Sequence, residues 1–258
     1  MLTRAVEKPV FVDGEKVKGF KAICRESDGY VYAIVSTNYA LIQHQDLLNI
    51  VNKVMTEIFE NPKIEYEEYN NGARLFIKVL LPSKIVQIRD NDAIIPAFYI
   101  QNSYDKSTGI KIIGGFYRVL CKNLAAFHKE FELRTSKRHI GKDLPERVKW
   151  SIEEMATSIF RSIELLKASA EKKLSLVRAA QIIDAVKIPE KCKDYIIEKL
   201  LEIKKLTLWD VFNYGTEYIT HKSNASIDRK ISMLQELSRI ILLANSEPNT
   251  QTNSRNQT

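Results

Sequence analysis

The stretch YIQNSYDKSTGIKI (residues 99–112) decides how the first half of this chain folds, because it lies between two apolar runs. It is rich in Asn, Asp, Ser, Thr and Gly, which favour turns. The side chain of Asp105 can bond local backbone, and Gly109 can take a positive φ. The stretch therefore predicts a hairpin turn between two strands. Its carboxylate, amide and hydroxyl groups could also hold a metal, a phosphate or a base edge, and turn and site are compatible.

Short β-rich runs precede this stretch, and one helix interrupts them. Asp13-Gly14 and Asn70-Asn71-Gly72 are turn signals between such runs. Pro96 is expected near a strand start or at a sheet edge, because it has no N–H to donate. The predicted strands are PVFV (9–12), KGFKAICR (18–25), YVYAIVS (30–36), KIEYEEY (63–69), ARLFIKVLL (73–81), SKIVQIRD (83–90) and IIPAFYIQN (94–102), and the predicted helix is QDLLNIVNKVMTEIFENP (45–62).

The character of the sequence changes after Gly114-Gly115. FYRVLCKNLAAFHKEF (116–131) is interpreted as a helix or a helix start, and from Pro145 onward the pattern is helical almost throughout. Strands followed by helices are typical of the α+β class. We therefore expect an α+β domain with an antiparallel or mixed sheet, a helical region that packs on it or forms a second subdomain, and a disordered polar tail. These three regions are 1–144, 145–244 and 245–258.

Composition limits the class of protein. The chain is 45% apolar and 28% charged, as folded soluble proteins are. No apolar run approaches the roughly 18–20 residues of a membrane helix, and the N-terminus lacks a signal-peptide core. A cytoplasmic location is expected, which would be the host cytoplasm for a viral protein. Three separate cysteines and four single histidines predict no disulfide framework and no metal or cofactor site. High Lys, Ile and Glu usage with little Gly suggests a thermophilic source.

The net charge of +7 is concentrated in one segment. Residues 106–149 contain eleven Lys or Arg and four Asp or Glu, so this segment alone carries +7 and the rest of the chain sums to zero. Such a concentration favours binding to a polyanion. The simpler interpretation is a solvated basic face.

The first basic candidate is residues 116–123, FYRVLCKN. On the predicted helix, Arg118 and Lys122 share one face and Asn123 lies beside them, so the group could seat a phosphate. It is not a Walker A loop. Cys121 is interpreted as a small buried residue rather than a nucleophile.

The densest basic cluster is RTSKRHIGK, residues 134–142. Its cations could neutralise several backbone phosphates, while Tyr104 or Tyr117 stacks on bases. The cluster comprises Arg134, Lys137, Arg138, His139 and Lys142. Farther along, LWDVFNYGTEYITHK (208–222) carries Asp210, Asn213 and His221 as polar insertions, for which a structural role is favoured.

Several of these pieces together resemble the phage/plasmid-like protein family, known as a domain of unknown function (number 932). The most specific part is the ordered trio NSYDxS, FYRxxCxN and RH, at residues 102–107, 116–123 and 138–139. Lys106 stands where the family usually has glycine after the aspartate. The other matching pieces are YALIQHQDLLNIVNKV (39–54), GARLFIKVLLP (72–82) and TLWDVFNYGTEYITH (207–221).

The resemblance implies cargo of phages, plasmids or other mobile elements, and it brings no accepted catalytic residues. It does mark Asn102, Ser103, Asp105 and Asn123 as candidate site-organising residues. The architecture is also similar in outline to phage single-strand annealing proteins, which need no nucleotide hydrolysis and often form rings or filaments. The leading hypothesis is therefore a nucleic-acid-binding protein, with single-stranded DNA favoured, that acts in annealing or recombination as a homo-oligomer rather than as an enzyme.

Two other functions stay open. One is a metal-dependent nuclease or phosphoryl hydrolase, in which Asp105 binds Mg²⁺ and His139 or Asn123 assists. A second carboxylate would have to come from a residue such as Asp90, Asp92 or Asp210. The other is a protein-binding inhibitor of host defence, whose basic patch meets an acidic partner.

Overall fold

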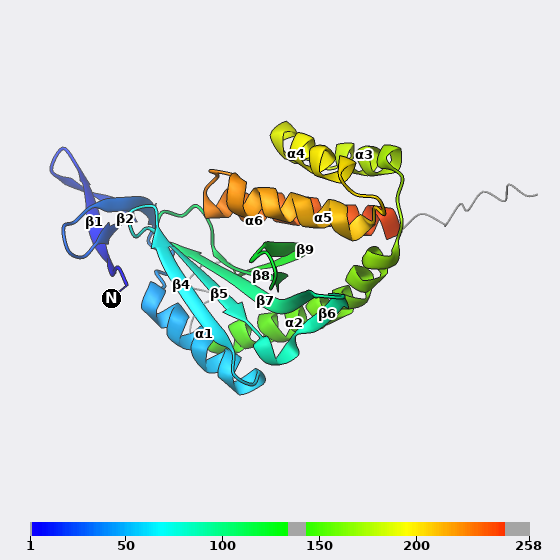
Figure 1. Ribbon diagram of the computed structural model, residues 1–258. Helices are drawn as coiled ribbons and strands as arrows, with labels where there is room; N and C mark the ends of the chain where they lie inside the picture. The colour runs from blue at the N-terminus through cyan, green and yellow to red at the C-terminus, as the bar shows by residue number, and fades with distance from the viewer. Residues whose placement is uncertain (1, 134–142, 246–258) are drawn as a thin grey trace, which may run out of the picture. The chain divides into compact units, whose positions relative to one another are not determined.

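The computed structural model of the chain describes residues 2–133 and 143–245 (Figure 1). The chain divides into two compact units, each of which is described by itself. Unit 1 comprises Met1–Lys122 and Lys129–Arg161, and unit 2 comprises Asn123–His128 and Ser162–Thr258. The chain therefore passes from one unit to the other three times, and the segment Asn123–His128 belongs with residues far ahead in the sequence.

The first three strands form a small antiparallel sheet in the order β1-β2-β3. Asp13 and Gly14 make its first turn with φ of 49° and 82°, as an Asp-Gly pair predicts. Ile23 and Val35 lie in a small apolar core together with Tyr104. The strands are β1 (Ala5–Val12), β2 (Glu15–Arg25) and β3 (Val31–Ser36). The three strands predicted for this part of the chain are confirmed.

The second sheet is larger, and its strands follow the order β4-β5-β7-β8-β9, with β6 paired to β7. Its strands are β4 (Lys63–Tyr69), β5 (Arg74–Leu80), β6 (Val86–Arg89), β7 (Asp92–Ser103), β8 (Ile110–Arg118) and β9 (Leu124–Leu133), with a 3-10 turn at Pro82–Lys84. The register of β7 and β8 places Ile100 opposite Ile112 and Tyr99 opposite Ile113. The opening stretch is thus the turn of the central hairpin, as predicted.

Residues 116–131 are not a helix, contrary to the prediction. They form the end of β8 and most of β9. The apolar spacing in this stretch fits either element, and pairing with β7 decides between them: Tyr117 lies opposite Ile95 and Arg118 opposite Ile94. The helical half of the chain therefore begins only at Leu144.

Pro96 lies inside β7, in the interior of the sheet, and not at a strand start or edge as predicted. Its carbonyl accepts a hydrogen bond from the backbone N–H of Leu81 at 3.0 Å. In an antiparallel strand the N–H and the carbonyl of one residue point to the same neighbouring strand. The N–H that proline lacks would therefore face the side of β7 on which β5 and β6 lie. There β7 changes its partner from β6, whose first residue Val86 pairs with Ile94, to β5, whose last residue Leu80 pairs with Ala97. No ladder bond is lost, because the proline stands at the junction.

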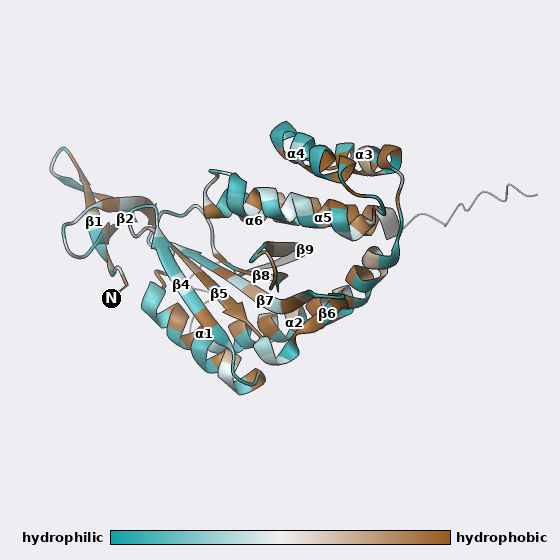
Figure 2. Ribbon diagram, in the orientation of Figure 1, coloured by the Kyte–Doolittle hydropathy of each residue, from teal (hydrophilic) through white to brown (hydrophobic). Residues whose placement is uncertain are grey.

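Two helices pack on the large sheet within unit 1. Helix α1 (His44–Ile58) has a polar and an apolar side (Figures 1 and 2), and Leu47, Val51 and Met55 on its apolar side are 0% exposed. Their spacing of four residues is that of one helical face. Helix α2 (Leu144–Glu171) approaches β8 so closely that a Cβ on Gly114 would lie 2.6 Å from Sδ of Met155. A side chain at position 114 would therefore force the side chains of Met155 and Ile159 to shift.

Unit 2 is helical apart from its short segment 123–128. Helix α5 (Leu208–Glu217) begins with a capping box, in which Thr207 Oγ1 accepts from the N–H of Asp210 and the Asp210 carboxylate accepts from the N–H of Thr207. The other helices that lie wholly in unit 2 are α3 (Leu176–Asp184), α4 (Glu190–Leu201), a π-helix (Tyr218–Lys222) and α6 (Ile227–Asn245). The α+β class, with a β-rich first half and a helical second half, is confirmed. Among the described residues, no helix combines the length and the apolar character that a membrane span requires.

Candidate nucleic-acid interface

The turn between β7 and β8 is braced by Asp105. Its Oδ1 accepts from the N–H of Ser107 at 3.0 Å, which closes an Asx-type turn. Its Oδ2 accepts from Nε of Arg74 at 2.7 Å and from Nδ2 of Asn70 at 3.0 Å. Burial acts to raise the pKa of Asp105, but the hydrogen bonds from Ser107 and Arg74 outweigh it, and the pKa is lowered. Asp105 therefore stays ionised and ties the turn to the neighbouring hairpin.

The same turn holds Lys106 outward. Lys106 is exposed and has a φ of 60°, the left-handed conformation that glycine adopts most easily. Ser103 supports the turn from the other side, because its Oγ donates to the carbonyl of Thr108 at 2.7 Å and accepts from the Thr108 N–H at 3.2 Å. Ser103 and Asp105 thus organise the turn, while the cation that follows Asp105 faces solvent.

Tyr104 does not present its ring to a ligand, contrary to the prediction that it stacks on bases. The residue is 0% exposed. Its hydroxyl donates to the carbonyl of Thr3 at 3.0 Å and accepts from the N–H of His44 at 2.8 Å, and its ring stacks on the imidazole of His44 with 3.8 Å between centroids. Burial raises the pKa of Tyr104. The residue joins the small sheet, the turn and α1 in one core.

Asn102 is also buried, and it fixes the orientation of His44. Its Nδ2 lies 3.1 Å from the carbonyl oxygen of Ile42 and 3.1 Å from Nδ1 of His44. An amide N–H donates to Nδ1 only if that nitrogen carries no proton, so the proton of the neutral imidazole is on Nε2. Nε2 is buried without a hydrogen-bond partner among the described residues. Burial lowers the pKa of His44 to about 4, although the backbone of Gly72 and the charge of Asp105 oppose the shift.

Arg118 lies at the end of β8 and is held by an aspartate. Its Nε and one terminal nitrogen donate to the two carboxylate oxygens of Asp92 at 2.6 and 2.7 Å, and the side chain of Asp92 is only 3% exposed. The other terminal nitrogen lies 3.4 Å from Sγ of Cys121. The predicted helical face shared by Arg118 and Lys122 does not exist, because Lys122 lies in the turn after the strand, exposed and with a φ of 54°. Arg118 is thus engaged in a paired, structural contact.

Asn123 connects two family-like motifs that are far apart in the sequence. Its Oδ1 lies 3.0 Å from Nε2 of His221, and its Nδ2 donates to Oγ1 of Thr216 at 3.3 Å. The next residue, Leu124, donates its N–H to Oγ1 of Thr220 at 3.2 Å. Asn123 is 1% exposed. These contacts give a structural role to polar residues of the stretch 208–222, where one was favoured.

The remaining predicted residues are only partly accounted for. Tyr117 is half-buried on β8, with Nζ of Lys78 5.3 Å from its ring centroid. Five residues of the predicted interface lie outside the described residues: Arg134, Lys137, Arg138, His139 and Lys142.

One exposed aromatic was not singled out from the sequence. Trp150 follows directly after the basic segment 106–149, lies on α2, and is 56% exposed. Its neighbours along the helix include Arg147 and Lys149. An exposed tryptophan beside cations is a stacking surface of the kind that single-stranded nucleic acids use. The sequence alone could have indicated Trp150 as a candidate stacking residue, because it directly follows the charged segment.

The carboxylates considered for a metal site have other contacts. Asp105 and Asp92 bind arginines, and Asp210 caps α5. Within residues 2–133 and 143–245, no group of three His, Cys, Asp or Glu is placed to hold a metal ion.

Comparison with known proteins gives a family. The model of the family described as Domain of unknown function (DUF932) matches residues 31–257, most of the chain. No curated protein and no solved structure matches the chain. The stretches quoted for the resemblance all lie within the matched range, so the chain belongs to the DUF932 family.

Proposed function

We propose that this chain is a nucleic-acid-binding protein that favours single-stranded DNA. The observation that carries the proposal is the charge distribution: the segment 106–149 holds a charge of +7, which equals that of the whole chain. A local excess of this kind suits a phosphate backbone, whose binding releases counterions. The exposed Lys106, Lys122 and Trp150 are consistent with it, since they offer cations and a stacking face.

The proposed interface differs from the one expected from sequence. Tyr104 and Arg118 are removed from the ligand-contacting set, because the first is buried and the second is paired with Asp92. Trp150 joins Tyr117 as a candidate stacking residue. The phosphate-binding set consists of Lys122 with Arg134, Lys137, Arg138, His139 and Lys142. Action in annealing or recombination for a phage, plasmid or virus, in the host cytoplasm and as a homo-oligomer, is part of the proposal.

The test is binding of labelled single-stranded DNA at increasing salt. The affinity should fall by orders of magnitude between about 50 and 200 mM salt if six or more phosphates are contacted. The triple variant R134E/K137E/R138E should lose binding. The matched control K191E/K204E/K205E makes the same charge change at three exposed lysines of unit 2 and should bind like the wild type. The proposal is contradicted if R134E/K137E/R138E binds as tightly as the wild type, or if the wild type does not bind at about 50 mM salt.

The two other functions have separate readouts. A nuclease would show Mg²⁺-dependent cleavage that Asp105→Ala abolishes, although Asp105 already accepts three hydrogen bonds. An inhibitor of host defence would retain a host protein after nuclease treatment of the lysate. Neither is favoured by a contact among the described residues.

A further inference from the structure

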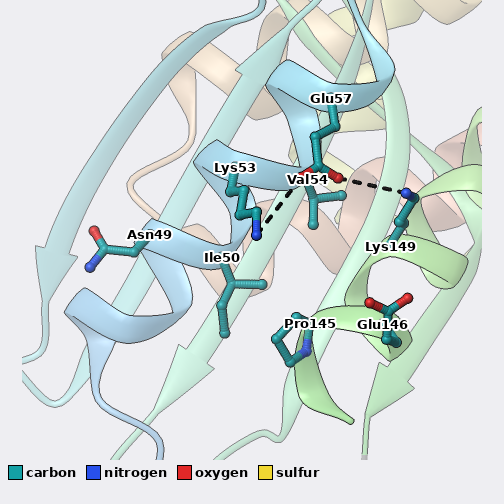
Figure 3. A pocket seen from close by; sticks show the side chains of 8 residues that line it. All are labelled: Asn49, Ile50, Lys53, Val54, Glu57, Pro145, Glu146 and Lys149. Atoms are coloured by element: carbon teal, nitrogen blue, oxygen red, sulfur yellow. Dashed lines mark ion pairs between the residues drawn. The ribbon is translucent and has the colours of Figure 1, made fainter. Parts of the chain in front are cut away.

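A pocket of about 250 Å³ lies within unit 1, between α1 and the first turns of α2 (Figure 3). Helix α1 contributes positions spaced by three or four residues, as one side of a helix must. Helix α2 contributes three positions from its first two turns. The lining residues are Asn49, Ile50, Lys53, Val54, Glu57, Pro145, Glu146 and Lys149.

The pocket has an apolar part suited to a flat group. Ile50 and Val54 follow each other along α1, and Pro145 faces them from α2 (Figure 3). Val54 is 4% exposed, so it forms the floor rather than the rim. The volume is below the roughly 300–1,000 Å³ of pockets that take drug-sized ligands. It therefore suits a single small ring.

The polar part carries both signs of charge. The carboxylate of Glu57 lies 3.6 Å from Nζ of Lys149 and 4.0 Å from Nζ of Lys53. Both distances exceed those of hydrogen bonds, so these lysines can also donate to a ligand. Glu146 and Asn49 add a carboxylate and an amide on either side of the apolar part.

This set of groups matches the chemistry of an unpaired base on a phosphate backbone. A carboxylate accepts from the amino group of cytosine and an amide pairs with the amino edge of adenine, whereas lysine binds phosphate or base oxygens. Thymine and uracil have no amino group to donate. Along the chain, Pro145, Glu146 and Lys149 belong to the segment 106–149 that carries the net charge, so one wall of the pocket is part of that segment.

We propose that the pocket between α1 and α2 binds one unpaired nucleobase, with Glu146 selecting bases that carry an amino group. The proposal rests on the proposed function, because the backbone of the same strand would be held by the basic segment. It specifies the ligand further: single-stranded nucleic acid, read at one position, with cytosine preferred over thymine.

The test compares three labelled strands of equal length: oligo(dC), oligo(dT) and a strand of abasic sites. All three carry the same phosphates, so they separate recognition of the base from binding of the backbone. Oligo(dC) should bind at least about tenfold more tightly than oligo(dT), since a hydrogen bond to a charged group has this magnitude. Oligo(dC) should also bind the protein at least about tenfold more tightly than the abasic strand does.

Two matched variants identify the residue. E146Q and E153Q remove the same charge from exposed positions of α2, but only Glu146 lines the pocket. E146Q should reduce the preference for oligo(dC), because the amide keeps an acceptor but loses the charge that strengthens the bond, and E153Q should keep the preference. Salt-dependent binding that is equal for oligo(dC) and the abasic strand, or a preference that E146Q leaves intact, overturns the base pocket and leaves the proposed function standing. Absence of binding to all three strands at low salt overturns both.

Discussion

Acidification should destabilise the protein through His44. In the folded chain the imidazole is buried against Tyr104 with a pKa of about 4, whereas the ordinary pKa of a histidine side chain is 6.5. Between these two pKa values the unfolded chain binds a proton that the folded chain does not. Stability from this group is therefore complete above pH 6.5 and is lost as the pH falls toward 4.

The size of the loss follows from the shift. A pKa difference of about 2.5 units corresponds to about 3 kcal/mol when the whole window is crossed, and to about 2 kcal/mol between pH 7 and pH 4.5. Asp105, whose pKa is lowered, loses its contribution only at still lower pH. The window between pH 6.5 and 4.5 thus isolates the histidine from the carboxylate that braces the turn.

The assay is urea denaturation of the wild type and of His44→Gln at pH 7 and pH 4.5. The glutamine keeps a side-chain acceptor but has no proton to gain, so the variant should lose about 2 kcal/mol less than the wild type over this interval. Other titrating groups are present in both proteins and cancel in the comparison. Equal losses in the wild type and His44→Gln would refute the reasoning.

Three further substitutions test the packing by urea denaturation. Asp105→Ala removes three hydrogen bonds and should lower the free energy of unfolding by about 1–3 kcal/mol; unchanged stability would show that the brace is dispensable. Gly114→Ala places a Cβ against Met155 and should cost about 1–3 kcal/mol, less when combined with Met155→Ala; simple additivity would speak against the contact. Thr207→Ala removes the cap of α5 and should cost about 1 kcal/mol, whereas Thr207→Ser should cost little; equal losses would mean that the hydroxyl is unimportant.

Local chemistry made much of the fold predictable. Turn signals such as Asp13-Gly14 and the Asx-type turn at Asp105 depend on neighbouring backbone, so the sequence contains their cause. The prediction of a helix over residues 116–131 was wrong because apolar spacing alone cannot distinguish a short buried strand from a helix. The position predicted for Pro96 was also wrong. The point at which β7 changes its partner depends on how strands β5 and β6 pair with it, and the local sequence does not show this.

The candidate site was less predictable, because its contacts are long-range. The hydroxyl of Tyr104 bonds a carbonyl 101 residues away, and Arg118 binds an aspartate 26 residues back. Both residues have the chemistry of ligand contacts, and only their tertiary partners reveal that they are used internally. The pocket that Glu146 lines was invisible for the same reason, since its other wall is a helix almost a hundred residues earlier.

The three passages of the chain between its units have a consequence for dissecting the protein. A single cut cannot isolate unit 2: a cut after Arg161 leaves Asn123–His128 behind, and a cut after Lys122 keeps Lys129–Arg161 of unit 1 attached. After the first of these cuts, the helices around Asn213 and His221 would lose an interior side chain and the hydrogen bonds that it makes. Recombination between members of this family would meet the same constraint. A recombinant that folds must take the two pieces of unit 2, Asn123–His128 and Ser162–Thr258, from one parent, or from two parents whose pieces pack together.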